Sequence, residues 1–159
     1  MDVPLKNFWG IRMTMDEYFM DLAIEEALKA EEEGEVPVGA VCVYNNEILS
    51  KAHNRVIALK DATAHAEIEA MREAAQKIGN WRIPGVWLYV TIEPCIMCAS
   101  AMIHFRIERL IYGAKEERWG GVEKYGIFKH SPNHKIEVIS GVKEDECKKI
   151  IKRFFEGKR

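Results

Sequence analysis

The chain carries the segment TAHAE at residues 63–67 and, about thirty residues later, the segment EPCIMC at residues 93–98. Cys95 and Cys98 stand three positions apart, so at the start of a helix both sulfur atoms project from the same face. Pro94 suits the first position of that helix, where its missing N–H has no partner to lose. Two thiolates and the imidazole of His65 make a set of soft and borderline ligands, which predicts a zinc site.

The number of ligands indicates a catalytic rather than a structural zinc site. Structural sites are usually closed by four protein ligands, whereas catalytic sites keep three and leave a position for water. Glu67 follows His65 by two residues and is predicted to move protons between that water and a substrate. Residues i and i+2 of a continuous helix point about 200° apart. We therefore expect His65 at the irregular start of its helix, where it can converge with Glu67.

The cysteine pair alone has weaker interpretations. A C-x-x-C pair also fits a redox-active dithiol, half of a zinc ribbon or a chance match. The presence of Pro94, His65 and Glu67 at this distance favours the metal site over all three. The pattern leaves open an inactive relative that keeps zinc only for stability.

Length and composition are those of an ordinary globular protein. The 159 residues suffice for one compact domain with a substantial core, so residues 1–159 are predicted to form a single domain. No apolar run approaches the roughly 18 residues of a membrane span, and the N-terminal residues lack the pattern of a signal peptide. We expect a cytoplasmic protein without membrane contact. The net charge of −2 means that any RNA binding must use local basic patches.

The four cysteines are not expected to form disulfides. Such a set would suggest two bridges in a small secreted protein, but the chain length and the expected reducing location argue against them. Cys42 lies in an apolar run and Cys147 in a helical pattern, so both are predicted to be buried core thiols.

The N-terminal segment is the least defined by pattern. Residues 1–13 show no periodicity, so they form either a mobile arm or a segment that packs Phe8 and Trp9 onto the core. Thr14 and Glu17 then form a capping-box pattern, which predicts the start of a long helix.

Hydrophobic periodicity predicts the remaining elements. Strands are expected up to residue 43, after which Asn45 and Asn46 form a turn, and over 47–52, 86–91, 107–112 and 136–139. Helices are expected over 64–78, 95–105 and 143–155, the first of them capped by Asp61 and Thr63. This alternation predicts an α/β fold with a mixed sheet, in which catalytic groups lie where strands end and helices begin.

Two basic segments have two interpretations each. Residues 115–134 interleave basic with aromatic side chains, which suits base stacking and phosphate binding but also fits a surface loop whose aromatic residues enter the core. The helix over 143–155 has a basic outer face that is either solvated or a phosphate clamp. Its inward side chains are predicted to be Cys147, Ile150, Ile151, Phe154 and Phe155.

The two zinc segments occur in order with other short motifs over about residues 15–157. These are VPVGA at 36–40, Asn54, AMIH at 101–104, NH at 133–134 and FF at 154–155. The set resembles the bacterial tRNA-specific adenosine deaminases of the TadA type, within the cytidine/deoxycytidylate deaminase superfamily. The resemblance implies a three-layer α/β/α cytidine-deaminase-like domain with a mixed central five-stranded sheet and one zinc ion per subunit.

The same resemblance implies an activity and roles for individual residues. The enzyme would convert the wobble adenosine of a tRNA, position 34, to inosine and release ammonia. Zinc would be bound by His65, Cys95 and Cys98, and Glu67 would move the protons. The residues implied to contact the substrate are Asn54, which would hold the base, Val36, Ala66, Pro94, Glu116 and Phe154. The implied partners are the tRNA anticodon stem-loop and a second copy of the chain, packed through the helix over 95–105.

The sequence departs from many of these relatives at Ala62, Phe105, Glu116 and residues 122–125. Most of these positions fall in the segment expected to select the substrate, so the reaction type is better supported than the substrate. The alternative is a deaminase of a free nucleobase or nucleoside, of guanine or cytosine type. A lid formed by residues 115–134 would favour this alternative, and an open groove would favour RNA. A catalytically silent subunit or RNA-binding module is disfavoured by the retained Glu67.

Overall fold

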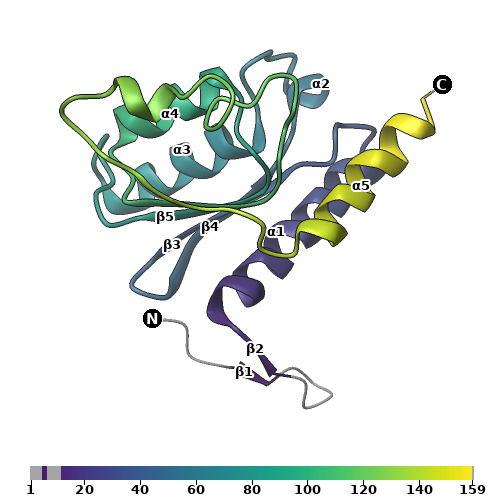
Figure 1. The fold of residues 1–159 in the computed structure, drawn as a ribbon, viewed down its shortest axis with the longest axis horizontal. Coiled ribbons are helices and arrows are strands. Elements are labelled where there is room, and N and C mark those ends of the chain that lie inside the picture. The colour runs from purple at the N-terminus through teal and green to yellow at the C-terminus, as the bar shows by residue number, and fades with distance from the viewer. Residues whose placement is uncertain (1–4, 7–11, 159) are drawn as a thin grey trace.

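The centre of the molecule is a five-stranded mixed sheet (Figure 1). The computed structural model describes residues 5–6 and 12–158. The strands are β3 (Gly39–Tyr44), β4 (Glu47–His53), β5 (Trp87–Ile92), β6 (Arg109–Ala114) and β7 (Glu137–Ile139). Their order is β4-β3-β5-β6-β7, with β3 antiparallel to both neighbours and the last three strands parallel. The predicted α/β class with a mixed sheet is confirmed.

Helices cover both faces of this sheet. One face carries α1 (Met15–Glu32) and α5 (Glu144–Glu156), which lie side by side, and the other carries α3 (Ala66–Ile78) and α4 (Ile96–Phe105) (Figure 1). Successive strand residues therefore enter different cores: Val41 packs in the apolar cluster beneath α1, and Cys42 in the cluster beneath α3. The arrangement has the three layers implied by the resemblance.

The local signals at the start of α1 and in the first hairpin act as predicted. The hydroxyl of Thr14 accepts a hydrogen bond from the backbone N–H of Glu17 (3.1 Å), and the Glu17 carboxylate accepts one from the backbone N–H of Thr14 (3.0 Å). Asn45 and Asn46 join β3 to β4 with φ angles of 49° and 64°. These left-handed conformations match the twist of the two strands.

The segment before α3 differs from the prediction. The helix begins at Ala66, and His65 is its N-cap residue with an extended backbone. Asp61 and Thr63 do not cap it, because the Asp61 carboxylate instead accepts hydrogen bonds from the N–H and hydroxyl of Thr63 and closes a turn upstream. The structure adds the short α2 (Val56–Leu59), which the sequence patterns did not predict.

The start of α4 also differs by one position from the prediction. Cys95 is the N-cap residue and Ile96 the first helical residue, so Pro94 precedes the helix instead of opening it. Cys98 then lies in the first turn of α4. Both cysteines remain at the helix N-terminus, so the predicted convergence of the sulfur atoms does not depend on this shift.

Two segments of the chain lie outside the central sheet: the N-terminal strands and residues 115–134. β1 (Leu5–Lys6) and β2 (Arg12–Met13) pair with each other as antiparallel strands, whereas Phe8 and Trp9 lie outside the described residues. The segment 115–134 contains only the short 3₁₀ helix η1 (Ile127–His130). Within the described ranges, no helix is both long and apolar enough to cross a bilayer.

Candidate active site

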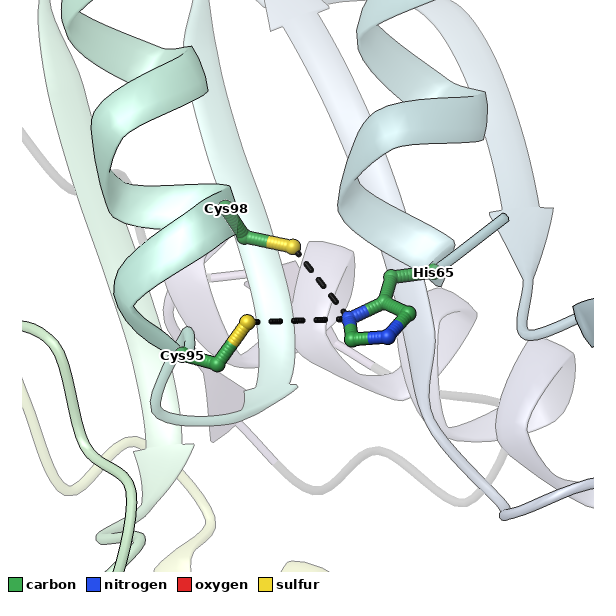
Figure 2. Close-up of side chains that lie close together, drawn as sticks. All are labelled: His65, Cys95 and Cys98. Carbon is green, nitrogen blue, oxygen red and sulfur yellow. Dashed lines mark hydrogen bonds between the residues drawn. The ribbon is translucent and has the colours of Figure 1, made fainter. Parts of the chain in front are cut away.

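The N-termini of α3 and α4 bring the three predicted metal ligands together. His65 caps α3, Cys95 caps α4, and Cys98 follows one turn later. Figure 2 shows both sulfur atoms pointing from the start of α4 towards the Nδ1 edge of the His65 ring. The extended backbone of His65 (φ −71°, ψ 154°) gives it the irregular position that convergence with Glu67 required.

The spacing of the three ligand atoms fits a zinc ion. His65 Nδ1 lies 3.5 Å from Cys98 Sγ and 3.7 Å from Cys95 Sγ, and the three ligand atoms lie within 4.8 Å of one another. Bond lengths of about 2.0 Å to nitrogen and about 2.3 Å to sulfur place tetrahedral zinc ligands about 3.5 Å apart. No fourth His, Cys, Asp or Glu joins this group among residues 5–6 and 12–158, which is the ligand count of a catalytic site.

The two thiols have very different proton affinities. The pKa of Cys95 falls to about 4, because its thiolate accepts a hydrogen bond from Cys98 and faces the His65 ring. The same hydrogen bond, together with burial, raises the pKa of Cys98. Metal binding requires both thiolates and a neutral imidazole. One thiolate is therefore formed readily by the protein itself, and a bound divalent cation would favour ionisation of the second.

Glu67 is a buried carboxyl beside this centre. Its side chain is on the first turn of α3 and only 3 % of its surface is exposed. Burial raises the pKa of Glu67 to about 7, and the neighbouring Cys95 thiolate acts in the same direction. A carboxyl with a pKa near neutrality can both accept and donate a proton during one reaction cycle.

A cavity of about 220 Å³ opens directly onto His65, Glu67 and Cys95. Typical sites for drug-sized ligands have about 300–1,000 Å³, so this cavity suits a single planar group such as a nucleobase. Its polar wall residues are Asn54, Glu93 and Glu116. The apolar wall residues are Val36, Val38, Ile92, Trp119, Ile151 and Phe155.

The structure brings only some of the implied substrate contacts to this cavity. Val36, Asn54 and Glu116 line it, whereas Ala66 is buried in the core beneath the helices. Pro94 and Phe154 are not part of the cavity wall. In place of Phe154, the wall contains its neighbour Phe155, whose ring centroid lies 5.3 Å from that of Phe154. Phe155 was predicted to point inward, but half of its surface (50 %) is exposed.

Two residues of the cavity wall, Trp119 and Glu93, were not individually predicted to contact the substrate. Trp119 lines the cavity although 63 % of its surface is exposed, and Glu93 lies within the EPCIMC segment but had no assigned role. Each of the two interpretations of the segment fits one of its aromatic residues: Phe128 packs against the core, whereas Trp119 is exposed to solvent, where it could stack on a base. The aromatic and basic composition left both interpretations open and did not indicate which ring would face the cavity.

The remaining two cysteines are inert. Cys42 and Cys147 are buried free thiols, as predicted, and the described residues contain no disulfide. Burial raises the pKa of both thiols to about 12. Thiol chemistry is therefore confined to the pair at the start of α4.

Known proteins that resemble this chain contain a zinc-binding region of the same kind. A model of the cytidine and deoxycytidylate deaminase zinc-binding region matches residues 13–114. The chain belongs to this deaminase family. It is 46 % identical over 145 residues to the tRNA-specific adenosine deaminase of Bacillus subtilis (strain 168), covering 90 % of each chain. Zinc is therefore the cofactor of this family member, and its enzyme class is a zinc-dependent hydrolase.

Two solved deaminase structures resemble this one over most of their length. One, from a study of A-to-I editing by tRNA:A34 deaminases at the wobble position of transfer RNA, is 45 % identical, with a TM-score of 0.81 over 84 % of this chain and 98 % of its own. The other, a guanine deaminase from Bacillus subtilis, is 30 % identical, with a TM-score of 0.61 over 73 % of this chain and 77 % of its own.

Proposed function

We propose that this deaminase hydrolyses the 6-amino group of the wobble adenosine, position 34, of a tRNA, forming inosine and ammonia. The high identity to tRNA-specific adenosine deaminases over nearly the whole chain supports this substrate. The reaction type is supported by the observation that carries the proposal: His65, Cys95 and Cys98 converge, and His65 and Cys95 line one cavity together with the buried Glu67.

His65, Cys95 and Cys98 would hold the zinc ion, which when bound lowers the pKa of water from about 15.7 towards about 7. Glu67 accepts the proton of the attacking water as the new C6–O bond forms. It passes this proton to the ring nitrogen. Glu67 then takes the proton of the new C6 hydroxyl group and delivers it to the amino group, which leaves as ammonia when the C6–N bond breaks. Asn54, buried at the cavity wall, offers an amide to hydrogen-bond the base edge.

The exposed aromatic residues of the cavity wall favour RNA over a free nucleobase as the substrate. Trp119 and Phe155 form part of the wall and are 63 % and 50 % exposed, so residues 5–6 and 12–158 leave these two rings largely uncovered. An enzyme that encloses a free base would bury such rings. An exposed aromatic side chain can instead stack on a nucleotide next to the flipped base. The second candidate, a free guanine, is favoured only by the likeness to the guanine deaminase structure.

We further propose the partners and the setting of the enzyme. The anticodon stem-loop would lie along the open mouth, to which α5 contributes Ile151 and Phe155. Lys148, Lys149 and Lys152 of the same helix would bind its phosphates. Two copies of the single domain formed by residues 1–159 would form a homodimer through α4, on which Ile96 is partly exposed. A tRNA substrate supports a cytoplasmic location.

One assay tests the proposed substrate directly. The purified protein is incubated with an anticodon stem-loop that carries adenosine at position 34 and, in parallel, with guanine, cytosine and adenosine. Inosine in the RNA is the expected product, and ammonia from a free base alone would contradict the proposal. A stem-loop with the adenosine moved by one position controls for selection of the site.

A further inference from the structure

A second buried carboxylate, Glu93, lies beside the centre without any part in the proton transfers. It precedes the zinc-binding segment of α4, and only 3 % of its surface is exposed. Its Oε1 accepts a hydrogen bond from the backbone N–H of Glu116 (3.1 Å). Its Oε2 accepts two, from the backbone N–H groups of Val122 (3.1 Å) and Glu123 (2.9 Å).

Through these bonds, both carboxyl oxygens of Glu93 contact the same loop. No ion pair found in the described part of the chain includes Glu93, and the three hydrogen bonds to its carboxyl oxygens all come from backbone N–H groups. Bonds from N–H groups to a carboxylate are stronger than bonds between neutral groups. Glu93 therefore binds residues 116–123, here called the wall loop, at both of its ends.

The middle of the wall loop is attached to the backbone of a zinc ligand. The N–H of Gly121 donates to the carbonyl of Pro94 (2.8 Å), and Gly120 pairs with Cys95 as an isolated antiparallel bridge. A Cβ atom on Gly121 would lie 2.7 Å from the Cys95 carbonyl oxygen, and one on Gly120 would lie 2.5 Å from Glu93 Oε2. This close approach requires glycine at both positions.

The wall loop has no regular secondary structure of its own, yet it carries two residues of the cavity wall, Glu116 and Trp119. The position of these side chains relative to His65 and Cys95 therefore depends on the attachments just described. We propose that Glu93 is a positioning residue, which holds the wall loop in register with the zinc ligand Cys95 and so forms the substrate side of the cavity before RNA binds. The kinetic part of this inference rests on the proposed function.

Glu93→Gln is the decisive variant. Glutamine has the same shape but keeps one acceptor oxygen and directs an amide NH₂ group at backbone N–H donors, so at least one bond is lost. We expect zinc content equal to the wild type, a KM for the stem-loop raised about 10- to 100-fold and a kcat within about threefold. Glu117→Gln, an exposed carboxylate of the same loop, is the matched control and should leave both constants unchanged.

Trp119 provides a readout that does not require activity. The chain has four tryptophans, so acrylamide quenching is measured in each protein with and without Trp119→Phe, and the difference reports on Trp119. Glu93→Gln should change this difference at least twofold. Glu35→Gln, which alters another buried carboxylate that accepts two backbone N–H groups, from Ile57 and Ala58, should not.

The outcomes separate this inference from the proposed function. Unchanged quenching of Trp119 in Glu93→Gln, or a fall in kcat at unchanged KM, would overturn the positioning role. If the wild type does not act on the stem-loop but quenching changes as expected, the positioning role stands and the proposed substrate fails. If Glu93→Gln does not fold, Gly121→Ala tests the same register from the side of Cys95, and it must show the same rise in KM with zinc retained.

Discussion

The metal centre and the wall loop meet at one cavity but are held in place by different means. His65, Cys95 and Cys98 stand at the ends of helices whose bodies are packed in the core. The wall loop is held by a few backbone hydrogen bonds to Glu93 and Pro94. The first region depends on side-chain identity at fixed positions, and the second on the path of an irregular backbone.

This difference predicts two classes of effect on the reaction. Changes at the metal centre remove chemical steps, so they should lower kcat and leave substrate binding largely intact. Changes in the wall loop alter the surface that meets RNA, so they should raise KM at a nearly constant kcat. Each prediction below tests one side of this division, beginning with the largest expected effect.

Removal of zinc should abolish deamination completely. Without the metal, water keeps a pKa near 15.7, and Glu67 has no activated group to deprotonate. The measurement is activity against zinc content during dialysis with a chelator, followed by addition of zinc, which should restore turnover. Cys98→Ala should behave as the stripped protein does, whereas Cys42→Ala should keep both zinc and activity. Turnover by protein shown to be free of metal would refute the assignment of the centre.

Glu67→Gln should lower kcat by about 10²- to 10⁴-fold, the usual contribution of a general acid–base group. The amide cannot carry a proton, but it fills the same buried space. Zinc content should stay at the wild-type level, as measured by metal analysis. Glu69→Gln on the same helix is the control, because this residue pairs with Arg72 and is not part of the cavity wall. A variant with normal kcat would mean that another group moves the protons.

The raised pKa of Glu67 should also appear in the stability of the metal-free protein. The carboxyl has a pKa of about 7 when folded and 4.5 as its ordinary value, so the folded state binds the proton more tightly. Its contribution to the free energy of unfolding is therefore lost as pH rises from about 4.5 to about 7.

Replacing this group with a neutral one removes that loss. At pH 8, metal-free Glu67→Gln should be more stable relative to wild type than it is at pH 4, by on the order of 3 kcal/mol. Urea unfolding at both pH values measures the difference. Ionisable groups that do not interact with Glu67 contribute equally to both proteins, so their contributions cancel. If the difference in stability between wild type and Glu67→Gln stays constant with pH, then ionisation of Glu67 does not destabilise the folded protein.

Trp119→Ala should have the smallest effect and should act on KM. Stacking of a base on an aromatic ring contributes about 1–3 kcal/mol, and a ring that stays largely exposed should lie at the lower end, so we expect a 5- to 30-fold rise in KM for the stem-loop. Trp81→Ala is the control, since Trp81 is similarly exposed (68 %) but is not part of the cavity wall. Equal effects of the two substitutions would remove the functional distinction between the wall loop and the rest of the surface.

The metal centre could be predicted from the sequence because its chemistry depends on short-range spacing. The order of strands and helices followed from periodicity, and the position of His65 at a helix start followed from the need to face Glu67. The misplaced cap at Asp61 and Thr63 had a local cause, since a turn and a helix cap use the same residue types.

The wall loop could not be predicted in the same way. Its path is fixed by contacts between Glu93 and residues more than twenty positions away, and no periodicity records such contacts. The choice of Phe155 over Phe154 as a wall residue depends on the rotation of α5 against α1 and the sheet. Composition therefore left two interpretations of the segment open, and the side chains that reach the cavity could be identified only from the structure.

The contrast between the two pairs of cysteines has a practical consequence. Burial raises the pKa of Cys42 and Cys147 to about 12 and leaves them almost no exposure to solvent, whereas Cys95 has a pKa of about 4 and is partly exposed. An alkylating reagent at neutral pH should therefore modify the native chain only where the metal has left. The labelled fraction, measured by mass spectrometry, would therefore report the fraction of the protein that lacks zinc in a preparation or in an extract.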